Sequence, residues 1–141
     1  MIRGYLLGDS LKVRVQKKQA EEAACFAAYF DNIKAYTLTD KTQSNVKAVF
    51  GYRINRAECA EAYALVGFDI GIGGLLETVH FFKRKIPLLM RQNQVECLQV
   101  SIQKDFLQAL KLVCLLGFEF RAELPDFFGQ RDYQLFERRN K

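Results

Sequence analysis

A cluster of glycines is the first feature of this sequence that could do chemistry. The stretch VGFDIGIGGLLETVHFF, residues 66–82, places Gly71, Gly73 and Gly74 at the start of a helical pattern. Bare backbone N–H groups at a helix start form an anion site, so these glycines could cradle a phosphate. The alternative is a tight turn between a strand and a helix, which needs glycine for its conformational freedom. The residues alone leave both interpretations open.

Other residue types that carry out catalysis are scarce. The single histidine, His80, lies within the helical pattern, and none of the serines stands in a G-x-S-x-G motif. The sequence also lacks the G-x-x-x-x-G-K-[ST] loop of nucleotide triphosphatases and any acidic-histidine cluster at metal spacing. These absences argue against a serine triad, a nucleotide triphosphate loop of the usual kind and a metal centre.

The cysteines are widely spaced and form no C-x-x-C pair. With one histidine they do not make a zinc-ligand pattern, so we expect reduced thiols and a cytoplasmic protein. The four positions are Cys25, Cys59, Cys97 and Cys114.

Composition predicts an ordinary globular protein. The chain has 141 residues, half of them hydrophobic, and we expect a single domain spanning residues 1–141. No apolar run approaches the roughly 20 residues that span a bilayer, and the first residues do not resemble a signal peptide. The net charge of +5 suits an anionic ligand but is too diffuse to indicate a nucleic-acid partner.

Hydrophobic periodicity predicts an alternation of strands and helices. A β-α-β step near residues 59–102 implies parallel pairing of the two strands that it joins. We expect Pro87 to kink or end the central helix, and Phe127 and Phe128 to lie in a hairpin loop. The expected strands are 2–7, 34–40, 46–54, 59–68, 95–102, 118–124 and 131–139, and the expected helices are 16–32, 74–92 and 104–118. The residues predicted to be buried are Ile72, Leu76, Val79, Leu98, Val100, Leu110, Val113 and Phe118.

This order of elements, the glycine turn after the fourth strand of the set, and the pattern A-x-x-L-x-x-x-L-G-F ending at Phe118 resemble the GNAT superfamily of acyl-CoA-dependent N-acyltransferases. The stretch from AYTLTD to CAEAYALVGFDIG is similar to small GNAT-like proteins of tailed bacteriophages. The resemblance implies an α+β (mixed α/β) fold: a central mixed, twisted sheet of about six to seven strands flanked by about three to four helices.

The resemblance also implies a binding site for the diphosphate of an acyl-CoA such as acetyl-CoA. The pyrophosphate loop of the superfamily reads [Q/R]-x-x-G-x-[G/A], which Gly71, Ile72 and Gly73 match, with Gly74 following. The basic or amide position of that loop is Phe68 here, which weakens the charge-assisted part of the contact. Val66 would offer its backbone to the pantetheine arm as an added strand.

The catalytic positions implied by the resemblance are less complete. Many members protonate the departing thiolate with a tyrosine four residues before the glycine of G-F, and that position is Val113 here. A glutamate on the fourth strand often acts as general base, and Glu61 occupies a suitable place. Tyr63 shares its face of the strand, and Tyr133 is a further phenol.

Two functions remain open from the sequence. One is acyl transfer from acetyl-CoA to an amine of a small molecule or protein. The other is a structural or interaction protein of the same fold without catalysis, with a phage virion as an alternative location and a virion component or a second copy of the chain as partner. Gly71, Gly73 and Glu61 favour the first function, whereas Phe68 and Val113 favour the second.

Overall fold

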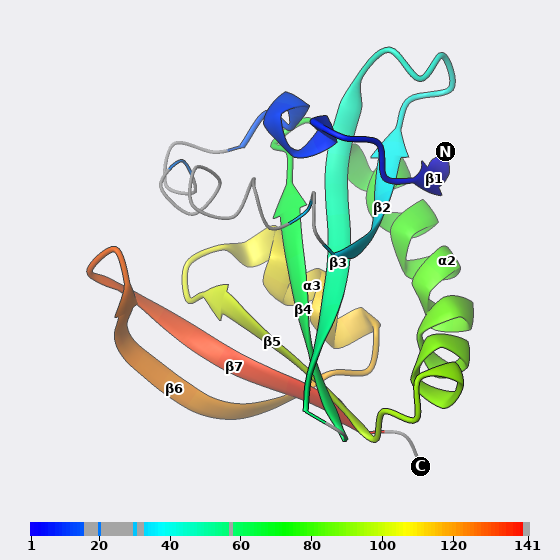
Figure 1. The fold of residues 1–141 in the computed structure, drawn as a ribbon. Coiled ribbons are helices and arrows are strands. Elements are labelled where there is room, and N and C mark those ends of the chain that lie inside the picture. Colours follow the sequence, from blue (N-terminus) through cyan, green and yellow to red (C-terminus); the bar gives the residue numbers. More distant parts are fainter. Residues whose placement is uncertain (16–19, 21–29, 31–32, 57, 140–141) are drawn as a thin grey trace. The chain divides into compact units, whose positions relative to one another are not determined.

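The computed structural model describes all residues except 16–19, 21–29, 31–32, 57 and 140–141 (Figure 1). Cys25 and nearly all of the helix predicted at 16–32 lie outside the described residues. The described elements are β1 (Ile2–Gly4), the 3-10 helix η1 (Asp9–Lys12), β2 (Lys34–Thr39), β3 (Val46–Arg56), β4 (Cys59–Val66), α2 (Gly71–Gln92), β5 (Cys97–Gln103), α3 (Leu107–Leu115), β6 (Glu119–Phe128) and β7 (Arg131–Arg139).

Seven strands form one mixed sheet in the order β1-β2-β3-β4-β5-β7-β6. The parallel pair predicted by the β-α-β step is present: β4 and β5 run side by side, with Cys59 opposite Cys97 and Glu61 opposite Gln99. The β1–β2, β2–β3, β5–β7 and β6–β7 pairs are antiparallel. This mixed sheet confirms the predicted fold class. The described residues contain two α-helices, fewer than the three to four expected.

The chain divides into two compact units. One unit comprises Met1–Tyr52 and Tyr63–Thr78, and the other comprises Arg53–Ala62 and Val79–Lys141. The strands β3 and β4 and the helix α2 each contribute residues to both units. The single domain predicted for residues 1–141 stays a prediction.

The core of the first unit forms where β3 and β4 present branched and aromatic side chains to the segments around them. Tyr63 packs against this core from β4. The buried members of this cluster are Val13, Phe30, Val46, Val49 and Leu65.

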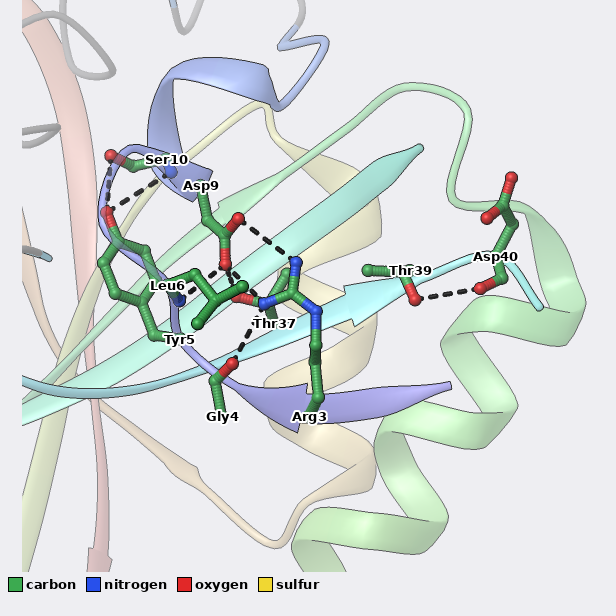
Figure 2. Close-up of polar contacts among 9 residues, drawn as sticks. All are labelled: Arg3, Gly4, Tyr5, Leu6, Asp9, Ser10, Thr37, Thr39 and Asp40. Carbon is green, nitrogen blue, oxygen red and sulfur yellow. Dashed lines mark hydrogen bonds and ion pairs between the residues drawn. The ribbon is translucent and has the colours of Figure 1, made fainter. Parts of the chain in front are cut away.

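A buried ion pair attaches the short strand β1 to the same unit (Figure 2). The guanidinium of Arg3 donates to both carboxylate oxygens of Asp9, at 2.7 and 3.2 Å. The Leu6 N–H and the Thr37 hydroxyl also donate to Asp9 Oδ2, each at 2.8 Å. Burial alone raises the pKa of Asp9, but these hydrogen bonds outweigh it and hold the pKa below its ordinary value.

In the second unit, the part of α2 from Val79 onward buries one face of the helix. Val79, Phe82, Ile86 and Met90 recur at the helical spacing and are all buried. Of the two outcomes predicted for Pro87, a kink or the end of the helix, the end is wrong, because α2 continues through Pro87 to Gln92. Proline removes a hydrogen bond and crowds the preceding turn. Buried residues on both sides of Pro87 offset that cost.

Two residues of α2 predicted to be buried are exposed. Ile72 and Leu76 both lie in the first turns of the helix, with 78% and 62% of their surface exposed. Residues seven apart share a helix face, so Leu76 lies on the face of the exposed Lys83 rather than on the buried face. Ile72 shares a face with Val79, but it lies at the exposed beginning of the helix, two turns away.

The other predicted core positions belong to the second unit and are largely confirmed. Leu98, Val100, Val113 and Phe118 are buried, whereas Leu110 is half-buried because Leu112 takes the inner position of α3. Val79 is buried as well.

The hairpin formed by β6 and β7, orange and red in Figure 1, differs from its predicted form in its turn. Phe127 and Phe128 belong to the end of β6 and not to the loop, since Phe128 pairs with Arg131. The turn itself is formed by Gly129 and Gln130, both with positive φ.

Leu112→Ala in α3 should lower the free energy of unfolding by about 2 to 5 kcal/mol, because it removes a fully packed side chain. Leu107→Ala in the same helix is the matched control, since Leu107 is 67% exposed and Leu112 only 3% exposed. The control should change stability by less than about 0.5 kcal/mol. Urea unfolding of both variants measures the difference, and equal losses would contradict the assigned helix face.

Asp9→Asn should destabilise the protein at neutral pH by about 3 kcal/mol, because it leaves the Arg3 guanidinium without its carboxylate partner. The folded-state pKa of Asp9 lies below the unfolded value of about 3.9. Its stabilising effect is therefore fully present above that value and is lost as the pH falls through the folded pKa. When unfolding is measured from pH 7 downward, the difference in the free energy of unfolding between wild type and variant should become smaller below about pH 4. A difference that does not change with pH would refute the stabilising effect of the Arg3–Asp9 ion pair.

Candidate functional site

Two of the three glycines at the start of α2 are required by the structure, each for a different reason. Gly71 has a φ of +68°, a left-handed conformation that side chains with a Cβ rarely adopt. Gly74 is held by packing, since a Cβ there would lie 2.8 Å from Ile70 Cγ1 and 3.3 Å from Leu38 Cδ2. Gly71 therefore makes the turn, and Gly74 lets the helix pack closely against β2.

Gly73 has neither reason. It lies within the helix, its φ is not positive, and a Cβ built on it would meet nothing within 4 Å. Glycine is a poor helix former, so alanine at this position would stabilise an isolated helix. The protein by itself thus offers no conformational or packing explanation for this residue.

The chain that leads into the glycines is anchored by its backbone. The N–H of Gly67 donates to the Lys47 carbonyl at 2.8 Å, and the N–H of Phe68 donates to the Arg14 carbonyl at 2.9 Å. Val66, at the end of β4, is buried. This anchoring fixes the point at which α2 begins, where the first N–H groups of a helix lack intrahelical acceptors.

Two side chains beside the glycines alter the electrostatics of this helix start. Phe68 is 56% exposed and carries no charge. Asp69 has a buried Oδ1 atom with no hydrogen-bond partner. This oxygen lies close to Gly67, where an added Cβ would be only 2.6 Å from it. An acidic group beside a helix N-terminus is favoured by the helix dipole. It also repels a second anion at the same place.

No protein-family model matches the sequence, and no curated protein matches it either. The structure is nevertheless similar to solved structures over its whole length. One is the ribosomal-protein-S5-alanine acetyltransferase from Vibrio fischeri, with a TM-score of 0.69 and 9% identity over 99% of this chain and 92% of that chain. Another is an acetyltransferase of the GNAT family from Bacillus anthracis, with a TM-score of 0.68 and 9% identity over 99% and 93%.

A third similar structure is that of yncA from Salmonella typhimurium, which is described with its cofactor acetyl-CoA. The TM-score is 0.64 at 14% identity, over 100% of this chain and 94% of that chain. The chain has the GNAT fold. The resemblance inferred from the sequence is therefore correct at the level of architecture.

Within this GNAT fold, Glu61 lies in the second unit, in the ladder between β4 and β5. It is half-buried and stands opposite Gln99. The Gln99 amide donates to the Glu137 carboxylate at 3.1 Å. Glu61 thus stands at the end of the parallel ladder, two residues after the buried Cys59.

The two tyrosines of the predicted site have different surroundings. Tyr63, in the first unit, is half-buried and packs against the core cluster of that unit. Tyr133, in the second unit, is only 2% exposed, and its hydroxyl accepts a hydrogen bond from the Gln103 amide at 3.3 Å. Its ring also packs against Phe127 and Phe128, with centroids 5.4 and 6.4 Å away.

Sequence reasoning missed Asp69, although it lies within the quoted stretch. A carboxylate beside a glycine turn is an ordinary pattern, and only the structure shows that one oxygen is buried without a partner. Within the described part of the chain, no cluster of histidine, cysteine and acidic side chains could hold a metal ion. No described helix has the length and hydropathy needed to span a membrane.

Alanine substitutions at Gly73 and Gly74 should have opposite effects on stability. Gly73→Ala should raise the free energy of unfolding by up to about 1 kcal/mol, because the new methyl group meets open space and favours the helix. Gly74→Ala should lower it by about 1 to 3 kcal/mol, because the methyl group would overlap Ile70 Cγ1 and press against Leu38. Thermal unfolding of the two variants provides the measurement. A stability loss at Gly73 would show a structural role that the open space around it does not indicate.

Proposed function

We propose that this protein binds an acyl-CoA, with acetyl-CoA as the simplest case, and transfers its acyl group to an amine. The observation that carries the proposal is Gly73, a glycine in a helix with open space around it and no structural need of its own. Backbone N–H groups at a helix N-terminus bind diphosphates best where no side chain keeps the phosphate away. A ligand that approaches this backbone closely would explain the residue.

The fit of the residues to a CoA diphosphate is partial. The open surfaces of Gly71 and Gly73 and the positive end of α2 favour an anion. Phe68 supplies no charge-assisted hydrogen bond, and the carboxylate of Asp69 opposes an anion nearby. We therefore expect weak binding that depends on backbone groups, with Ile72 and Gly74 flanking the diphosphate and Val66 near the pantetheine arm.

The chemistry assigned to this chain is proton removal from the attacking amine. A bound acyl-CoA supplies a thioester carbonyl, which the amine nitrogen attacks as the carbon–sulfur bond breaks. Glu61 is proposed as the base that accepts the amine proton, directly or through water. Tyr63 is proposed to lie beside the acceptor, since residues two apart in a strand share a face.

The leaving thiolate requires a proton from another source. The usual tyrosine position is Val113, which is buried in α3, and the Tyr133 hydroxyl is already hydrogen-bonded inside the second unit. We therefore assign the proton of the leaving thiolate to solvent. Among the three residues proposed for the catalytic site, Tyr133 is a weaker candidate than Glu61 or Tyr63. Under this proposal the rate depends chiefly on positioning.

The second candidate function is a GNAT-fold protein that acts only by binding other macromolecules. Phe68 favours it, because an exposed phenylalanine in place of a basic residue weakens the phosphate contact and suits an apolar partner surface. A phage virion component and a second copy of this chain are the partners proposed for that function, in contrast to a cytoplasmic enzyme.

Calorimetric titration with acetyl-CoA, at concentrations up to about 1 mM, separates the two functions. Phe68→Arg should bind more tightly than the wild type, by at most about 1.5 to 3 kcal/mol, because a guanidinium adds a charge-assisted contact to the diphosphate. Phe68→Glu is the matched control at the same exposed position and should bind less tightly. If none of the three proteins binds acetyl-CoA, the diphosphate site is refuted and the binding-only function takes its place.

Gly73→Ala and Gly73→Val complete this test, because the space around Gly73 is open and neither side chain would clash in the protein without ligand. Both should weaken acetyl-CoA binding, valine more than alanine, because their side chains occupy the approach to the backbone. Unchanged affinity in Gly73→Val would place the ligand elsewhere.

A further inference from the structure

Two cysteines far apart in the sequence are brought together in the second unit. Cys59 is the first residue of β4 and Cys97 the first residue of β5, and they stand opposite each other in the parallel ladder. Neighbouring strands lie about 4.8 Å apart, and disulfides join Cα atoms about 4.4 to 6.8 Å apart. In-register residues project to the same face of a sheet, and both cysteines are free thiols. The backbone therefore already holds them at bonding range.

A buried carboxylate lies beside this pair. The Cys97 thiol is in hydrogen-bonding contact with the Cys59 sulfur and with the carboxylate of Glu137. Glu137, in β7, accepts hydrogen bonds from the Gln99 amide at 3.1 Å and from the Arg139 guanidinium at 2.7 Å. Its pKa is held below the ordinary value, with the Gln99 hydrogen bond as the largest cause, so it is ionised and can accept a proton.

The same surroundings keep Cys97 protonated at rest. Burial, with the neighbouring Cys59 and Glu137, raises the pKa of Cys97 to about 12. A thiol of this kind is a poor nucleophile unless a base removes its proton during the attack. Glu137 is placed to do so, which gives this buried carboxylate a chemical role that neither acyl transfer nor packing requires.

We propose that Cys59 and Cys97 form a reversible intramolecular disulfide when the protein meets hydrogen peroxide. The more exposed thiol, Cys59, reacts first: its sulfur takes one peroxide oxygen, giving the sulfenic acid and one water. Cys97 sulfur then attacks the Cys59 sulfur and its proton passes to Glu137. The sulfur–sulfur bond forms as the sulfur–oxygen bond breaks, and the leaving hydroxide takes the proton back from Glu137 and departs as a second water, which leaves Glu137 ionised again. A small thiol reverses the reaction by exchange.

This proposal is independent of the proposed acyl transfer, because it uses neither the glycines of α2 nor Glu61. The bond would join the first residues of β4 and β5. The exposed Cys114 of α3 provides an internal comparison, since it is open to peroxide but has no cysteine opposite it in the described ladders.

Peroxide treatment of the folded full chain, followed by alkylation in denaturant and tryptic mass spectrometry, tests the proposal. Cys25 lies in tryptic peptide 19–34, Cys59 in 57–83, Cys97 in 92–104 and Cys114 in 112–121, so each of the four cysteines is followed separately. We expect peptides 57–83 and 92–104 to appear joined, lighter by two hydrogens, and to separate again with dithiothreitol. A chain that leaves both peptides alkylatable, or that joins either one to another cysteine, refutes the pairing.

Variants isolate the two steps. Cys97→Ser should stop at the sulfenic acid of Cys59, which dimedone traps, and Cys59→Ser should show no joined peptide. Glu137→Gln should slow disulfide formation and accumulate the dimedone-reactive Cys59, with partial recovery of the rate at higher pH as Cys97 ionises without help. Thermal unfolding before treatment checks that each variant is folded. A Glu137→Gln protein that forms the disulfide at the wild-type rate refutes the role of the carboxylate.

Discussion

The close packing of helix α2 against strand β2 at Gly74 is the constraint on which the candidate site depends. A side chain at this position would overlap Ile70 and press against Leu38, so the absence of a Cβ lets the first turns of the helix lie close to the strand. The positive φ of Gly71 then determines where the helix begins, and the hydrogen bonds of the Gly67 and Phe68 N–H groups hold the preceding chain. Together these contacts leave the first helical N–H groups at a fixed, open place. An anion site needs such preorganisation more than it needs any single side chain.

The electrostatics of that place are balanced rather than strongly attractive. The helix dipole contributes a partial positive charge, while Asp69 contributes a nearby negative one with an unsatisfied oxygen. A guanidinium at position 68 would shift this balance toward an anion, and Phe68 does not. Under the proposed function, this explains why affinity for a diphosphate is expected to be weak and why a single substitution at this position should change it measurably.

The sequence predicted the order of the elements well, because alternation and helical spacing are local properties. It failed where the outcome depends on neighbours far along the chain. Ile72 has the right spacing for the buried face yet lies in the exposed first turn of α2, and Leu76 lies on the face of the exposed Lys83. Pro87 was expected to kink or end the helix on local grounds, but the helix does not end there, and buried residues lie on both sides of the proline.

The same distinction applies to the candidate sites. The three glycines were visible in the sequence, but the packing that requires Gly74 involves Leu38, which no local pattern shows. Cys59 and Cys97 showed no C-x-x-C signal, since their proximity comes entirely from the register of a parallel ladder. The sequence does not distinguish Asp69 from other acidic residues, and only the structure shows that its Oδ1 is buried without a hydrogen-bond partner.

The burial of Tyr133 and Val113 limits how a proton could reach the leaving thiolate in acyl transfer by this fold. Restoring a phenol by Val113→Tyr would force a larger side chain into a packed position of α3, where overpacking costs about 1 to 3 kcal/mol. Tyr133 has its hydroxyl hydrogen-bonded to Gln103 and its ring packed against two phenylalanines, so moving it would break both sets of contacts. Water is therefore the proton donor for the leaving thiolate that requires no loss of packing or hydrogen bonds. Under the proposed function, the chain contributes a base, a fixed backbone and orientation, and leaves the acid step to solvent.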